Sequence, residues 1–216
     1  MNPPPQIYAM NPLEISLSKI GRWKSPPNAA DATAASEWRQ MEDGRRILEA
    51  TQAILLQAET LLHVLSQEVY TQKVPIVFNA SIGGHIRHCL DHFTSLLRGM
   101  EQGLIDYDHR DREVRIESEP QFASDISRSI QLTLQSLKPE RLADRVTARC
   151  EVSYTQGDSP QVRSTLGREL VYAVAHAIHH FALIRVMAHL LGITLPPQFG
   201  LAPSTLAHLE RSAKAC

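Results

Sequence analysis

The sequence predicts an all-α fold, an antiparallel four-helix bundle with a small β-hairpin between helices three and four. Three observations carry this prediction. Apolar residues recur at helical spacing in four long segments, proline or glycine follows each of them, and one short segment alternates apolar with polar residues. The composition, with 43% hydrophobic and 21% charged residues, is that of a globular chain that can build a core.

We expect three regions along the chain. Residues 1–35 mix proline, serine, asparagine and alanine without a sustained apolar period, which predicts a flexible N-terminal arm. Residues 36–195 should form the bundle. Residues 196–216 should form a C-terminal tail with one short helix, which Ser204 or Thr205 can cap.

The first two helices are predicted by their period and by their end signals. Helix one should cover residues 36–70, where apolar residues three, four and seven apart form one face. Helix two should cover residues 80–102. Asn79 or Ser81 can cap its start, and Gly103 is a typical terminator.

The second half of the chain changes its pattern twice. A charged loop over 106–119 precedes helix three, which we expect over 122–137. Residues 146–154 then alternate with a period of two, and the turn residues at 156–160 allow a return strand. Helix four should cover 165–191. Its apolar stretch is long enough to cross a membrane, but it carries an arginine and four histidines, so we expect a buried helix.

Charge and cysteine content narrow the surroundings that we expect for the protein. The net charge of -1 and the sequence pI of about 6.8 give no electrostatic reason to bind nucleic acid or an anionic membrane. Three cysteines are too few and too scattered for a disulfide framework, and the start of the chain lacks the pattern of a secretory signal. We therefore expect a cytoplasmic protein that binds neither nucleic acid nor a membrane.

Six of the ten histidines lie in two short blocks on predicted core helices. GGHIRHCLDH in helix two carries His85, His88 and His92. AVAHAIHHFA in helix four carries His176, His179 and His180, of which His176 and His180 are four residues apart and share one helix face. Neutral imidazole is a common ligand of divalent metals, and a facing helix can supply a third ring. The blocks therefore predict a metal site, and the alternative is a set of hydrogen-bonded core histidines.

The two blocks also resemble a known family. The runs SIGGHIRHCLDHF and HAIHHFALI look like the metal-binding helices of the DinB/YfiT-like superfamily. Its members are four-helix bundles with one histidine on the second helix and a His-x-x-x-His pair on the fourth. The resemblance implies that His88, His176 and His180 bind one divalent metal ion. Zinc or nickel is favoured, and iron and manganese are compatible with the same ligands.

The ligand from helix two stays open, because His85, His88 and His92 point broadly the same way. His85 or His92 could join or replace His88, or could orient a ligand ring. His92 and Glu169 are the candidate catalytic groups, since Glu169 lies on the same helix face as His176. The alternative for both is a polar group at the rim of the pocket.

Three functions remain compatible with the sequence. The resemblance implies thiol-linked chemistry, in which the chain would be a metal-dependent transferase or a thiol-assisted isomerase. Its partners would then be a low-molecular-weight thiol and a small electrophilic substrate. A non-catalytic metal-binding or stress-related interaction protein is the alternative, and a metal-dependent hydrolase is the second alternative. The sequence does not decide whether the chain is an enzyme, and a homodimer is compatible with a bundle of this kind.

Overall fold

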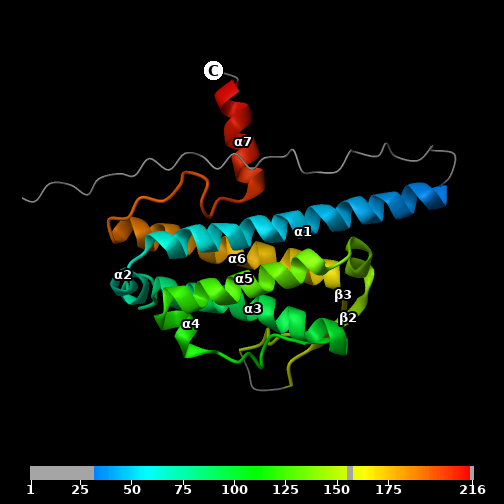
Figure 1. The fold of residues 1–216 in the computed structure, drawn as a ribbon, viewed down its shortest axis with the longest axis horizontal. Helices are drawn as coiled ribbons and strands as arrows, with labels where there is room; N and C mark the ends of the chain where they lie inside the picture. Colours follow the sequence, from blue (N-terminus) through cyan, green and yellow to red (C-terminus); the bar gives the residue numbers. More distant parts are fainter. Residues whose placement is uncertain (1–31, 155–157, 215–216) are drawn as a thin grey trace, which may run out of the picture. The chain divides into compact units, whose positions relative to one another are not determined.

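The computed structural model describes residues 32–154 and 158–214, which are mostly helical with one small sheet (Figure 1). The described residues from Arg39 onward form one compact unit. The flexible arm predicted over 1–35 lies outside the described residues, except for 32–35, which belong to the first helix.

The longest elements are four helices whose bounds are close to the predicted ones: α1 (Ala32–Val64), α3 (Ile82–Gln102), α5 (Pro120–Ser136) and α6 (Leu166–Leu190). Of the two predicted caps of α3, Ser81 is the one used, since its side chain accepts a hydrogen bond from the backbone N–H of Gly84 at 3.0 Å. Gly103 ends the helix in a left-handed conformation, as predicted.

Short helices fill the connections: α2 (Gln67–Thr71), α4 (Val114–Ser118) and the 3-10 helix η2 (Pro139–Ala143). The first helix ends at Val64 and not at residue 70, because the side chain of Ser66 caps α2 by accepting from the N–H of Val69. The charged segment predicted as a loop contains α4. Tyr70 fixes α4 by donating a hydrogen bond to the carbonyl of Ile116 at 2.6 Å.

The bundle is antiparallel only in part, because α3 and α5 run in the same direction, as the colours of Figure 1 show. The connection between them returns along α3: β1 passes next to Gly99 near the end of α3, and α4 passes next to Gly83 near its start. Helix α5 begins directly after α4 and therefore starts beside the start of α3. The pair α3 and α6 is antiparallel, and this pair carries both histidine blocks.

Two glycines let the returning connection pack closely on α3. A Cβ atom on Gly83 would overlap the carbonyl oxygen of Glu117 in α4. One on Gly99 would come within 2.7 Å of the Cα atom of Ile105. The lack of a side chain at these two positions is therefore required by the path of the chain.

The small sheet has the order β1-β2-β3, with the strands β1 (Leu104–Asp106), β2 (Arg145–Arg149) and β3 (Gln161–Thr165). Strands β2 and β3 form the antiparallel hairpin predicted between the last two long helices, with Val146 opposite Ser164. Strand β1 pairs in parallel with β2 and was not predicted, because three residues are too few to show a period. The turn predicted at 156–160 lies partly outside the described residues.

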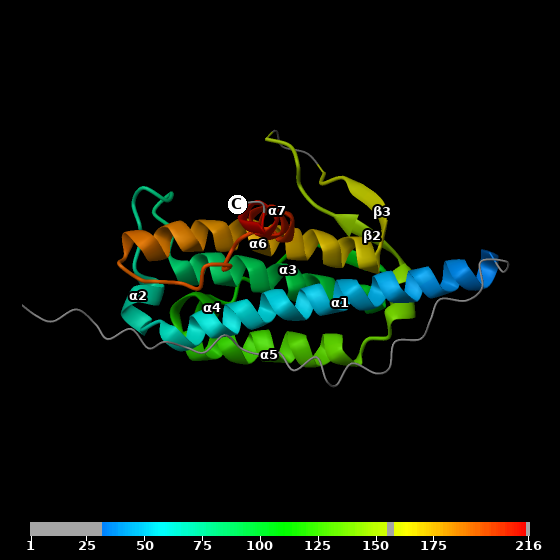
Figure 2. The ribbon, with the colours of Figure 1, turned by 90° about the horizontal axis from the view of Figure 1, so that it is seen from above.

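The core fills the space between α1, α3 and α6, and Figure 2 shows α6 lying alongside α3. Buried apolar side chains from these three helices meet there: Leu55, Ala58, Ile86, Phe93, Ala177 and Phe181. By length and composition alone α6 could cross a membrane, a test that core helices of soluble proteins also pass.

The segment after α6 folds back on that helix. Arg185 donates hydrogen bonds to the carbonyl oxygens of Pro197 and Phe199 at 2.7 and 3.1 Å. The ring of Phe199 stacks on Phe181 with 5.1 Å between centroids. Helix α7 (Pro203–Lys214) begins in the run where a short helix was expected.

Candidate metal centre

Helices α3 and α6 bring the two histidine blocks face to face. The ring of His85 lies 5.1 Å from that of His180, measured between centroids. The ring of His176 lies 4.9 Å from His88 and 4.3 Å from His92. Along the contact, the residue numbers rise in α3 and fall in α6, as expected for antiparallel helices.

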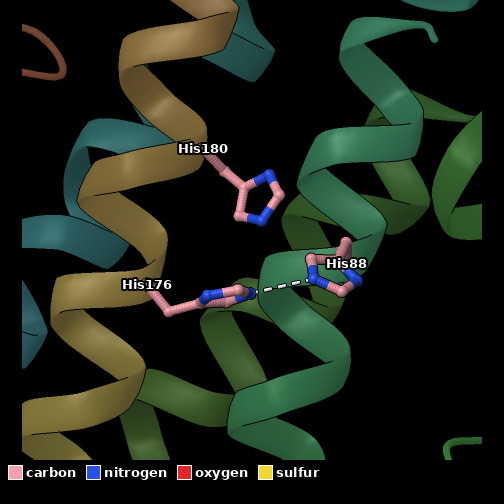
Figure 3. Close-up of side chains that lie close together, drawn as sticks. All are labelled: His88, His176 and His180. Atoms are coloured by element: carbon pink, nitrogen blue, oxygen red, sulfur yellow. Dashed lines mark hydrogen bonds between the residues drawn. The ribbon is translucent and has the colours of Figure 1, made fainter. Parts of the chain in front are cut away.

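Three of these rings form a group that could hold a metal ion. The ring nitrogens of His88, His176 and His180 lie within 4.8 Å of one another, and Figure 3 shows the rings converging from the two helices. The Nε2 atoms of His88 and His176 are 2.8 Å apart. Nitrogens bound to one ion at about 2.0–2.1 Å lie roughly 3 Å from each other. The donor set could therefore hold one divalent ion.

The three rings are half-buried and are neutral at physiological pH. Burial, together with the neighbouring histidines, lowers the pKa of His88 to about 2 and that of His180 to about 3. Burial also lowers the pKa of His176. A histidine binds a metal ion only when it is unprotonated, so the surroundings of these rings favour the state that a ligand needs.

His85 contacts one of the three rings and lies outside the group. Its Nδ1 atom is 2.8 Å from Nδ1 of His180. Because that atom of His180 faces His85, the nitrogen that points toward His88 and His176 in Figure 3 is Nε2. His85 is buried, and its own Nε2 has no hydrogen-bond partner among the described residues.

His92 lies beside the group of three and is not a member of it. Its Nδ1 is 2.8 Å from the carbonyl oxygen of His88, so this nitrogen carries the proton and donates it. The other ring nitrogen, Nε2, then has a free lone pair. Burial lowers the pKa of His92 to about 4, which keeps the ring neutral. This arrangement suits a proton acceptor next to the metal position.

Both oxygens of Glu169 are engaged away from the histidines. The hydroxyl of Tyr107 donates to one oxygen at 2.9 Å, and the hydroxyl of Ser164 donates to the other at 2.5 Å. The Tyr107 ring stacks on His92, with 5.3 Å between centroids. Glu169 therefore reaches the site through Tyr107, and a direct catalytic role for it stays a prediction.

Two tyrosines of the site were not predicted. Tyr172 precedes His176 by one helical turn and stacks on it, with 5.7 Å between centroids, so the helical spacing could have indicated it. Tyr107 follows β1, and its backbone N–H donates to the carbonyl of Arg149 at 2.9 Å. No local pattern predicts that strand, so the position of Tyr107 depends on the sheet.

A pocket of about 340 Å³ opens beside two of the three candidate ligands, His88 and His180. The remaining lining comes from His85, from the start of α3 and from the segments next to it: Lys73, Ala80, Ser81, Gly84, Arg87 and Glu117. A small molecule can therefore approach the metal position from this side.

Known proteins share this part of the chain. The profile of the DinB superfamily matches residues 47–184, a range that contains all the histidines of the site. FK506-binding protein 5 of Rhizopus delemar is 34% identical over 108 residues, which make up 50% of this chain and 28% of that protein. The chain thus spans little more than a quarter of that relative's length. No solved structure gave a significant match.

Proposed function

The chain belongs to the DinB superfamily, and we propose that it is a metal-dependent enzyme whose reaction uses a low-molecular-weight thiol. The observation that carries the proposal is a three-histidine group with a pocket beside it. Three protein ligands leave at least one coordination position for a molecule from solution, which is typical of catalytic rather than structural sites. Zinc or nickel is the favoured ion, and iron and manganese are compatible.

The chemistry divides between the ion and the side chains around it. The ion would favour the deprotonated form of a bound thiol. His92 accepts the proton at Nε2, because its Nδ1–H is held by the carbonyl of His88. Tyr107 stacks on His92 and limits its rotation, and Glu169 holds the Tyr107 hydroxyl. With a small electrophilic substrate, the thiol sulfur would bond to the electrophilic carbon as the bond from that carbon to its leaving atom breaks, and His92 would return the proton to the leaving atom.

Metal analysis of protein purified without an affinity tag tests the ligands. We expect one ion per chain, which His176→Ala or His180→Ala should abolish. His63→Ala is the matched control, because His63 is exposed on α1 and outside the group. A double variant of His176 and His180 that still binds one ion per chain would show that the ligand assignment is wrong.

Cobalt substitution tests the thiol chemistry. A low-molecular-weight thiol should produce a sulfur-to-cobalt charge-transfer band in the near ultraviolet, and transfer of the thiol to electrophiles should be lost in His180→Ala. A stoichiometric ion that no thiol reaches would favour the non-catalytic metal-binding or stress-related protein. Hydrolysis of ester or amide substrates without any thiol would favour the metal-dependent hydrolase.

We also propose the cytoplasm as the site of action, with neither nucleic acid nor membrane as a partner. The net charge of -1 supports this, as do the free thiols of Cys89 and Cys150. A homodimer is part of the proposal, and sedimentation at micromolar concentration would test it.

A further inference from the structure

The mouth of the pocket carries an excess of positive charge. Lys73 and Arg87 both pair with Glu117, each at 3.0 Å, and the lining of the pocket has these two cations and one carboxylate. Arg87 reaches Glu117 through its Nη1 atom, and its Nε has no hydrogen-bond partner among the described residues. Arginine has five N–H donors, so the ion pair with Glu117 does not use all of those on Arg87.

The proton on His85 can be placed from the metal site. If Nε2 of His180 binds the ion, that atom has no proton, and the neutral ring carries its proton on Nδ1. This Nδ1–H donates to Nδ1 of His85 at 2.8 Å, which must accept it. His85 then carries its own proton on Nε2. That N–H is a buried donor without a partner among the described residues, on a residue that lines the pocket.

The start of helix α3 adds further positive charge at the pocket. Helix α3 begins at Ile82, and Ser81 and Gly84 at its start line the pocket. The N-terminus of a helix of this length carries a partial positive charge that favours anions. The pocket, at about 340 Å³, lies at the small end of the range of about 300–1,000 Å³ that is typical of ligand sites. It therefore fits a small anion.

We propose that this pocket binds the carboxylate group of a small molecule whose other end reaches the metal position. Arg87 is its main ligand, and His85 Nε2–H and Lys73 are further donors. A carboxylate accepts several hydrogen bonds at once and matches the paired N–H groups of arginine. A ligand without an anionic group would leave these donors unpaired. The inference rests on the proposed function, since it assigns a chemical class to the molecule that the metal would bind.

Two thiols that differ by one carboxylate test the subsite in the cobalt-loaded full chain. N-acetylcysteine has the carboxylate, and N-acetylcysteamine has the same skeleton without it. The sulfur-to-cobalt band reports the binding of both. N-acetylcysteine should bind about tenfold more tightly, as expected for one charge-assisted hydrogen-bonded contact. Arg87→Met should remove this preference without weakening N-acetylcysteamine, and Arg87→Lys should restore part of it.

Arg141→Met is the matched control for the loss of one arginine. Arg141 is partly exposed, pairs with Glu101 and Asp144, and does not line the pocket. The variant should keep the full preference for N-acetylcysteine. Loss of the preference in both arginine variants would mean that net charge, and not the subsite, selects the thiol.

A carboxylate without a thiol separates failure of the subsite from failure of the thiol chemistry. Calorimetry with N-acetylalanine on the protein as purified should show binding that is weakened about tenfold in Arg87→Met. Such binding without any sulfur-to-cobalt band would support the subsite and refute the thiol proposal. Equal affinities of the two thiols, or equal affinities of wild type and Arg87→Met for N-acetylalanine, would overturn the carboxylate subsite.

Discussion

Replacing Gly83 with alanine should destabilise the protein, whereas the same change at Gly84 should not. A Cβ atom at Gly83 would overlap the carbonyl oxygen of Glu117 and would lie 2.8 Å from Cε1 of Tyr70. At Gly84 the nearest atoms are the Ser81 side-chain oxygen at 3.4 Å and Glu117 Oε1 at 3.6 Å, which are ordinary contacts. The two positions are adjacent in the first turn of α3, so they differ mainly in what lies opposite.

The magnitude follows from two opposing effects. Alanine gains up to about 1 kcal/mol over glycine in a helix, and this gain applies to both positions. Forcing an extra carbon into a filled space costs about 1–3 kcal/mol, and this cost applies to Gly83 alone. The helix gain cancels when the variants are compared with each other, so Gly83→Ala should be about 1–3 kcal/mol less stable than Gly84→Ala. At about 2–4 °C per kcal/mol, the melting temperatures should differ by several degrees.

Urea and thermal unfolding, followed by far-ultraviolet circular dichroism, measure the difference. Wild type should lie between the two variants or close to Gly84→Ala. Equal stability of the variants would refute the close approach of α4 to α3. It would also remove the basis for placing Glu117 at the pocket, since α4 carries that residue.

Two further predictions concern the groups around the site. Tyr107→Phe should cost about 1–3 kcal/mol in urea unfolding, because it removes a hydrogen bond from the buried carboxylate of Glu169. Tyr172→Phe, which removes a half-buried hydroxyl, should change stability by less than about 0.5 kcal/mol, and equal losses in the two variants would contradict this reasoning. The free energy of unfolding should also fall as the pH drops from 7 to 5. Burial holds the pKa of His88 and His180 in the folded protein below the value of about 6.5 that is expected in the unfolded chain. The unfolded chain therefore binds more protons than the folded protein in this range, which favours unfolding. On acidification, the melting temperature of the metal-loaded protein should fall more steeply than that of protein treated with a chelator. A melting temperature that stays level or rises on acidification would contradict the assignment of these histidines as neutral metal ligands.

Local patterns in the sequence determined the helices and the two faces that meet at the site. The helical period depends only on residues within two turns, and the end signals at Ser81 and Gly103 act on the neighbouring backbone. The spacing of four between His176 and His180 places both on one face for the same reason. The β-hairpin was predicted in the same way, from a period of two and the turn residues after it.

Tertiary structure alone decided the direction of α5, the pairing of β1, and the place of each histidine from α3. A helix has the same period whichever way it runs, so only the path of the returning connection makes α3 and α5 parallel. His85, His88 and His92 share one face of α3, and no local pattern ranks them. The register of α3 against α6 decides which of them joins the group. It places His88 between His176 and His180. His85 lies behind His180, and His92 lies beside His176. That register depends on packing between residues about ninety positions apart, which no short stretch of sequence contains.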